Sequence, residues 1–237
     1  NQLSQILNKR FLTDKPNYSP ICDTDTEFLS LLRFPQNNGY LVIEARDSAG
    51  NSLYAYGYPL PNTIVSTMRF CPKDMNLPDG TSILAVIVSG YEEKIYVLQK
   101  CCQPKFRVYF QNSYCGIDGI TFQKVLKKVA SKSSSWQKRK PMPGTNTLDI
   151  GRARFNIQQG IQYVLTLESK NKAYLEWLRE ITASSHAAYE CENSNGDTDL
   201  VAALVDDQSL TIDSSSKKFS RLQINIADAN PYNTRRN

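Results

Sequence analysis

Histidine is scarce in this chain, and its scarcity limits the chemistry that the protein can perform. The 237 residues contain only His186, so a zinc site or a Ser-His-Asp mechanism would have to use that single side chain. It follows Ser184 and Ser185 at the end of an expected helix, a context typical of a cap or a surface residue. We therefore expect no catalytic residue, no metal site, no cofactor and no enzymatic activity.

The glycines and carboxylates also lack the spacing that nucleotide or glycoside chemistry requires. None of the eleven glycines falls in the G-x-x-x-x-G-K-[ST] or G-x-G-x-x-G arrangements that hold phosphates. The acidic pair Asp206 and Asp207 precedes a strand-like segment and is typical of a turn. Long apolar runs are missing as well: the longest, residues 83–88, is far below the roughly 20 residues that span a bilayer as a helix. We expect no membrane insertion.

Six cysteines are too few to form a disulfide scaffold in a chain of this length. No C-x-x-C motif occurs, and the adjacent pair Cys101 and Cys102 is a poor candidate for a bridge. The sequence therefore predicts free thiols in a reducing compartment, most of them buried as small apolar side chains.

Short apolar segments bounded by turn residues recur along the chain and predict a mainly β fold. The length is sufficient for two domains. We expect residues 1–39, which are polar and contain Pro16, Pro20 and Pro35, to form an N-terminal arm or linker that lies on a neighbouring subunit. A short helix over residues 27–33 is compatible with its apolar spacing.

The two expected domains are β-rich and sandwich- or barrel-like. Residues 40–103 have the size and the turn spacing of an immunoglobulin-like β-sandwich. Residues 104–237 form the second domain, with one helix near residues 171–184 that plugs an end of the sheet.

Two segments of the second domain alternate between apolar and polar residues, as half-buried strands do. In the first, we expect Arg107 and Tyr109 to be exposed, while three apolar residues face the core: Phe106, Val108 and Phe110. In the last, the residues expected to face the core are Leu222, Ile224 and Ile226.

The strongest charge feature lies between Asp118 and Asp149, where thirty residues contain seven bases and no acid. Serine, proline and glycine accompany these bases, so we expect an exposed basic loop over residues 124–147. It is either a solvated loop or a contact for a neighbouring subunit or, without base specificity, for DNA. The candidate interface residues are Lys124, Lys127, Lys128, Lys132, Trp136, Lys138, Arg139 and Lys140.

The second domain resembles a family of tail-region structural proteins of Bacteroidetes phages, including crAss-like phages. The resemblance covers about residues 105–236 and is a pattern of several segments. It opens on Asn112-Ser113-Tyr114-Cys115-Gly116-Ile117-Asp118, where family members often have Gly-Gly in the turn. It continues through the helical residues 174–184, residues 188–191 and residues 201–207, and ends in an alternating tail with basic residues over 222–236.

The resemblance implies a structural virion component, a tail or portal-proximal assembly subunit without catalytic residues. It implies a homo-oligomer, arranged in a ring, that contacts other virion proteins and is located in the virion, or in the host cytoplasm during assembly. An alternative is a carbohydrate- or receptor-binding β module, for which the candidate ligand contacts are Tyr54, Tyr56 and Tyr58. These tyrosines could equally be one face of a hairpin that packs on a core. A hydrolase with an unrecognised site is the least supported class.

The cysteine pattern gives a first testable prediction. Alkylation of the unfolded protein without reductant should label all six cysteines, because no spacing favours a disulfide or a metal site. Intact-mass analysis measures the number of labels, and two or more protected thiols would contradict the prediction.

Overall fold

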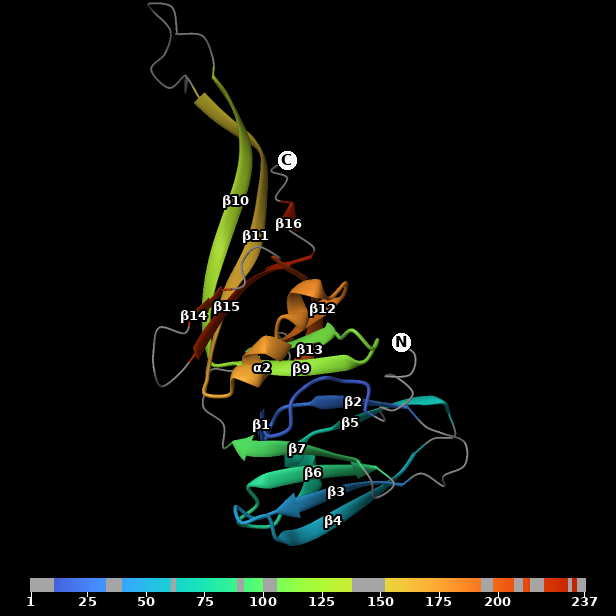
Figure 1. Cartoon of the computed structure of the whole chain (residues 1–237). Helices are drawn as coiled ribbons and strands as arrows, with labels where there is room; N and C mark the ends of the chain where they lie inside the picture. The colour runs from blue at the N-terminus through green and yellow to red at the C-terminus, as the bar shows by residue number, and fades with distance from the viewer. Residues whose placement is uncertain are drawn as a thin grey trace, which may run out of the picture.

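The protein is mainly β, as the sequence predicts. The computed structural model describes residues 11–32, 40–60, 63–88, 92–99, 106–137, 152–192, 198–206, 211–213, 220–229 and 232–233. Two β-rich units lie one above the other in Figure 1, and a long hairpin extends from the second unit. No helix within the described residues is long and apolar enough to cross a membrane.

The first unit is a sandwich of a five-stranded sheet and a two-stranded sheet around one hydrophobic cluster. The five-stranded sheet has the order β1-β7-β6-β3-β4, in which only β1 and β7 pair in parallel, and β2 pairs with β5 in the other sheet. The strands are β1 (Ser19–Cys22), β2 (Glu27–Leu32), β3 (Tyr40–Arg46), β4 (Ser52–Pro59), β5 (Val65–Phe70), β6 (Ile83–Val88) and β7 (Glu92–Gln99), with a short 3-10 helix, η1 (Pro72–Met75).

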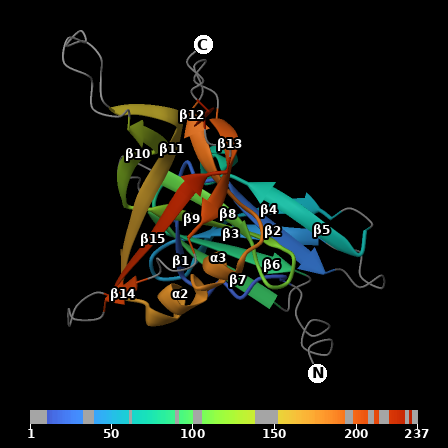
Figure 2. The same ribbon diagram turned by 90° about the horizontal axis from the view of Figure 1, so that it is seen from above.

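The second unit is a nine-stranded sheet whose main path is β10-β11-β15-β13-β12-β8-β9. Side chains from both ends and the middle of this sheet reach one cluster, so the sheet curves around it. Figure 2 shows β10 beyond β11, away from β12 and β13. The strands are β8 (Phe106–Gln111), β9 (Ile117–Phe122), β10 (Lys124–Gln137), β11 (Arg152–Ser169), β12 (Ala187–Glu192), β13 (Thr198–Val205), β14 (Thr211–Asp213), β15 (Ser220–Asp228) and β16 (Tyr232–Asn233).

A broken helix fills the inner face of this curved sheet, as the apolar pattern predicts. Helix α2 (Lys172–Trp177) begins after Asn171, whose side chain accepts a hydrogen bond from the Tyr174 amide, and α3 (Glu180–Ala183) follows. Leu175, Leu178 and Ile181 are at most 1% exposed. They pack against the buried face of β15, where Leu222, Ile224 and Ile226 point inward as expected.

The expectation that the N-terminal segment is an arm on another subunit is wrong for residues 11–32. Phe11, Ile21 and Leu29 are buried in the first cluster of their own chain. The expected helix over residues 27–33 is also wrong, because these residues form β2 and pair with β5. The segment has few apolar residues, but four of them, Phe11, Ile21, Leu29 and Leu31, are buried in a core that later strands complete.

Buried charges join this N-terminal segment to the second unit. The Arg107 guanidinium lies 3.1 Å from Asp25 Oδ2 and donates to Glu27, while Lys15 Nζ donates to the other Glu27 oxygen at 2.6 Å. Lys15 also donates to the carbonyl of Gly119 at 2.9 Å. All four charged side chains are nearly inaccessible to solvent. They form a buried ion network between β2 and the β8–β9 pair.

Arg107 and Tyr109 are therefore buried, contrary to the expectation from alternation. Their face of β8 is covered by β2, so both faces of the strand lie inside the protein. Gly119 on β9 is required here, because a Cβ at that position would lie 2.5 Å from an Arg107 nitrogen. Burial lowers the pKa of Arg107, but Glu27 and Asp25 outweigh it and raise the pKa above its ordinary value.

Hydrogen bonds of Asp118 extend this contact between the two units toward the start of the described chain. It accepts hydrogen bonds from Thr13 at 2.8 Å and from the Asn112 amide at 3.0 Å. The same Asn112 amide donates to the Leu12 carbonyl, and its oxygen accepts from the Gly116 amide. Burial raises the pKa of Asp118, and Lys15 and the two hydrogen bonds only partly oppose this.

We predict that Arg107→Met strongly destabilises the protein. The substitution leaves Asp25 and Glu27 buried without their guanidinium partner, which costs about 3–5 kcal/mol. Lys124→Met is the matched control, because the Lys124–Glu168 pair is exposed and should contribute little. Urea denaturation of both variants measures the difference, and equal midpoints would refute the role assigned to the network.

Asp118→Asn should change how stability depends on pH. A raised pKa means that the folded protein binds the proton more tightly than the unfolded chain. The stability that Asp118 contributes is therefore present at low pH and is lost as the pH rises through the interval between the two pKa values. The asparagine keeps an oxygen for Thr13 and Asn112 but does not titrate.

As the pH rises above about 4, the ordinary pKa of an aspartate, the free energy of unfolding of the wild type should therefore decrease relative to that of Asp118→Asn. Urea denaturation at a series of pH values makes the comparison. Parallel profiles for the two proteins would show that Asp118 does not titrate in this range.

Candidate assembly surfaces

The hairpin of β10 and β11 extends away from both hydrophobic clusters (Figure 1). Pairing of β11 with β15 covers only residues 162–169, and β16 pairs with Gln158 and Gln159. Within the described part of the chain, the distal residues 152–155 of β11 pair with β10 alone. At roughly 3.3 Å per residue, the part of β10 beyond Lys128 spans about 30 Å. The hairpin is thus presented to the surroundings of the molecule.

The expectation of a basic loop over residues 124–147 is wrong for residues 124–137, which form β10. The serines and lysines of this segment are compatible with a strand because one side of the β10 backbone pairs with β11. Lys138, Arg139 and Lys140 lie outside the described residues, as do the side chains of Lys132 and Trp136.

The remaining lysines of the predicted interface divide between the two faces of β10. Val125 packs against the second cluster, so Lys127 lies on the inner face, beyond the cluster. Lys124 and Lys128 lie on the outer face with Leu126 between them, and all three are exposed. Lys124 donates to Glu168 at 3.0 Å. The strand therefore presents a 57% exposed leucine between two cations.

The three tyrosines predicted as ligand contacts share one face of β4, the edge strand of the first unit. Tyr56 and Tyr58 pack partly against the first cluster, while Tyr54 is 54% exposed. The rings of Tyr54 and Tyr56 lie 4.6 Å apart, and the Tyr56 hydroxyl donates to the Asn76 carbonyl. Because two of the rings are engaged by the protein, the three do not form an open aromatic platform.

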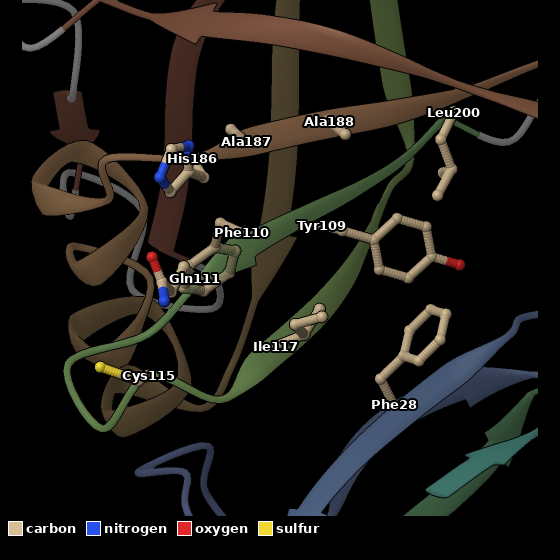
Figure 3. Close-up of a pocket in the computed structure, with 10 residues that line it drawn as sticks. All are labelled: Phe28, Tyr109, Phe110, Gln111, Cys115, Ile117, His186, Ala187, Ala188 and Leu200. Carbon is tan, nitrogen blue, oxygen red and sulfur yellow. The ribbon is translucent and has the colours of Figure 1, made fainter. Parts of the chain in front are cut away.

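A groove of about 400 Å³ lies on the second unit, where the outer face of its sheet emerges from beneath β2 (Figure 3). Phe28 of β2 contacts Tyr109 edge to face, with ring centroids 5.3 Å apart. The other lining residues come from the second unit: Phe110, Gln111, Cys115, Ile117, His186, Ala187, Ala188 and Leu200.

The lining of this groove suits an apolar side chain. Ile117 is 40% exposed and Leu200 is 58% exposed, although both are large and apolar. The Tyr109 hydroxyl donates to Glu190. Burial, followed by the contact with Glu190, raises the pKa of Tyr109, so the hydroxyl stays protonated at neutral pH. The groove therefore combines an apolar floor with an acidic rim.

No sequence pattern predicts this groove directly, because Phe28 and Leu200 are far apart in the chain. One signal was available in β13, where Leu200 and Leu204 alternate with Val201 and Val205 and make both faces of the strand apolar. When both faces of a strand are apolar, the second face is expected to contact another element or a partner.

Two residues that line the groove, His186 and Cys115, have side chains that could take part in chemistry. His186 is exposed, and its backbone carbonyl accepts a hydrogen bond from the backbone amide of Gln111. Cys115 lies on the turn between β8 and β9. No group of three metal-ligating side chains occurs in the described ranges. Comparison of the sequence with models of protein families found no match, and comparison with curated proteins found none either.

Proposed function

We propose that this protein is a structural subunit of a phage virion, of the tail or portal-proximal region, which oligomerises and contacts other virion proteins. The observation that carries the proposal is the protruding hairpin of β10 and β11. The similarity of residues 105–236 to tail-region structural proteins supports the type of assembly.

An isolated two-stranded hairpin is only marginally stable in water. Here the distal hairpin extends beyond the strands that enclose the second cluster, and β10 is the edge of the nine-stranded sheet. A partner that packs on the hairpin would supply the missing contacts. In a ring of identical subunits, that partner is the neighbouring copy.

The buried ion network supports a structural role for a second reason. It ties residues 11–27 to β8 and β9, so that the first unit and the base of the hairpin are positioned together. A subunit that transmits its orientation to its neighbours requires such a joint. The described lysines of β10 can also attract DNA phosphates, but a uniform positive charge carries no base preference, and such binding should weaken steeply with salt.

Shortening the hairpin tests the proposal. In the test variant, residues 133–157 are removed and Lys132 is joined to its partner Gln158 by Asn-Gly, a favoured two-residue turn. The variant should fold, because the pairing of β11 with β15 is retained. It should assemble only at higher concentrations than the full-length protein, because the contacts of the distal hairpin with its neighbour are lost.

Sedimentation velocity and mass photometry measure assembly, and circular dichroism confirms the fold. Tyr54→Ala, on an exposed strand far from the hairpin, is the control, and this variant should assemble normally. Assembly of the shortened variant at wild-type concentration would remove the hairpin from the proposal. A wild-type protein that stays monomeric and binds glycans would favour the receptor-binding alternative.

A further inference from the structure

The outer face of the nine-stranded sheet is covered at the β8–β9 end, while its outward residues on β13 and β10 are exposed. At the β8–β9 end, β2 covers Arg107 and Tyr109. Further along, the outward residues of β13 remain exposed, with Leu200 at 58% and Leu204 at 60%. The neighbouring outward positions are small: Ala188 on β12 faces Ala202 on β13. This surface is apolar and lets another backbone approach closely.

The two ends of this open face carry opposite charges. At the β10 end, Leu126 stands between Lys124 and Lys128 on the outer side of the strand. At the β12 end, Glu190 pairs in register with Leu200, and Glu192 lies two residues further along the same face. Glu192 is exposed and Glu190 is partly buried beside Tyr109. One end is an apolar residue between cations, and the other is an apolar groove with an acidic rim.

We infer that the groove is the docking site for β10 of a second copy of this chain, with Leu126 in the groove and Lys124 and Lys128 against Glu190 and Glu192. The inference rests on the proposed assembly function and names its contact. The two surfaces are complementary in charge and in apolar character, and both belong to every copy. No other partner is needed to satisfy them.

The contact is head to tail. The sheet curves around its cluster, so its outer face is convex and its two ends point in different directions. Two copies therefore cannot satisfy both ends through one two-fold contact. Each copy instead offers its hairpin to one neighbour and its groove to another, and such a contact produces a ring when the rotation closes.

Charge exchange tests this contact. The hairpin variant carries Lys124→Glu with Lys128→Glu, and the groove variant carries Glu190→Lys with Glu192→Lys. In either variant alone, like charges meet at every contact. The concentration at which assembly begins should rise by about tenfold or more. In an equal mixture every hairpin-to-groove contact between unlike variants is again complementary, so assembly should return.

The control is Lys73→Glu with Lys172→Glu, which makes the same charge change at exposed positions outside both surfaces and should assemble as the wild type does. Two results would overturn the docking site and leave the proposed function intact, provided that the wild type assembles. In the first, the hairpin variant and the groove variant each assemble normally; in the second, their mixture does not recover assembly. A wild-type protein that is monomeric at all concentrations would overturn both.

Cross-linking supplies a measurement that does not depend on the charge variants. Leu126→Cys with Leu200→Cys should form an intermolecular disulfide, because Leu200 lines the groove and stands in register with Glu190. Leu53→Cys with Leu200→Cys, in which the first substitution replaces an exposed leucine on β4, is the matched control. Under mild oxidation, only the Leu126 variant should give a ladder of covalent oligomers, and Leu126→Cys without the second substitution should give far less. A ladder of equal yield from the control, or a link that maps away from position 200, would contradict the contact.

Discussion

The buried guanidinium of Arg107 is the interaction on which the rest of the structure depends. It holds Asp25 and Glu27 on one side and Thr121 on the other, so a single side chain fixes the N-terminal segment against β8 and β9. Strand β2 then has two roles: it completes the sandwich of the first unit and covers the outer face of the second. The groove exists because this cover ends at Phe28. Without the joint, neither the groove nor the base of the hairpin would have a defined relation to the first unit.

Buried charges are a costly way to join two units, since each ion loses its hydration. Apolar side chains of similar size could give comparable stability but would permit several registers. The ion network is more selective, because each donor has a specific acceptor: Lys15 reaches both Glu27 and the Gly119 carbonyl. Our hypothesis is that the network specifies the register of residues 11–27 on β9. A register shift would leave at least one buried charge unpaired.

The sequence predicts the strands of this protein better than it predicts their neighbours. The alternation of β15 and the apolar face of residues 174–181 report a single buried side, and both predictions are confirmed. Alternation predicts the wrong exposure for Arg107 and Tyr109. A polar side chain indicates a solvent-facing position only when no other part of the protein supplies its hydrogen-bond or charge partners. Likewise, residues 11–32 resemble an arm because their apolar residues are few, and their burial depends on β3, β6 and β9. The charge pattern predicts Lys124 and Lys128 as interface residues, but it does not predict the strand that places Leu126 between them.

The lysines of β10 explain how an exposed edge strand can remain selective. An open edge with unpaired backbone groups invites indiscriminate pairing, and charged side chains, lysine above all, discourage it. In the free subunit, Lys124, Lys127 and Lys128 would repel the β10 edge of another copy. The same charges favour a partner that offers carboxylates, so the groove beside Glu190 and Glu192 is favoured over a second hairpin. Under the proposed contact, repulsion between like ends and attraction between unlike ends would both impose one direction on assembly, as a head-to-tail ring or filament requires.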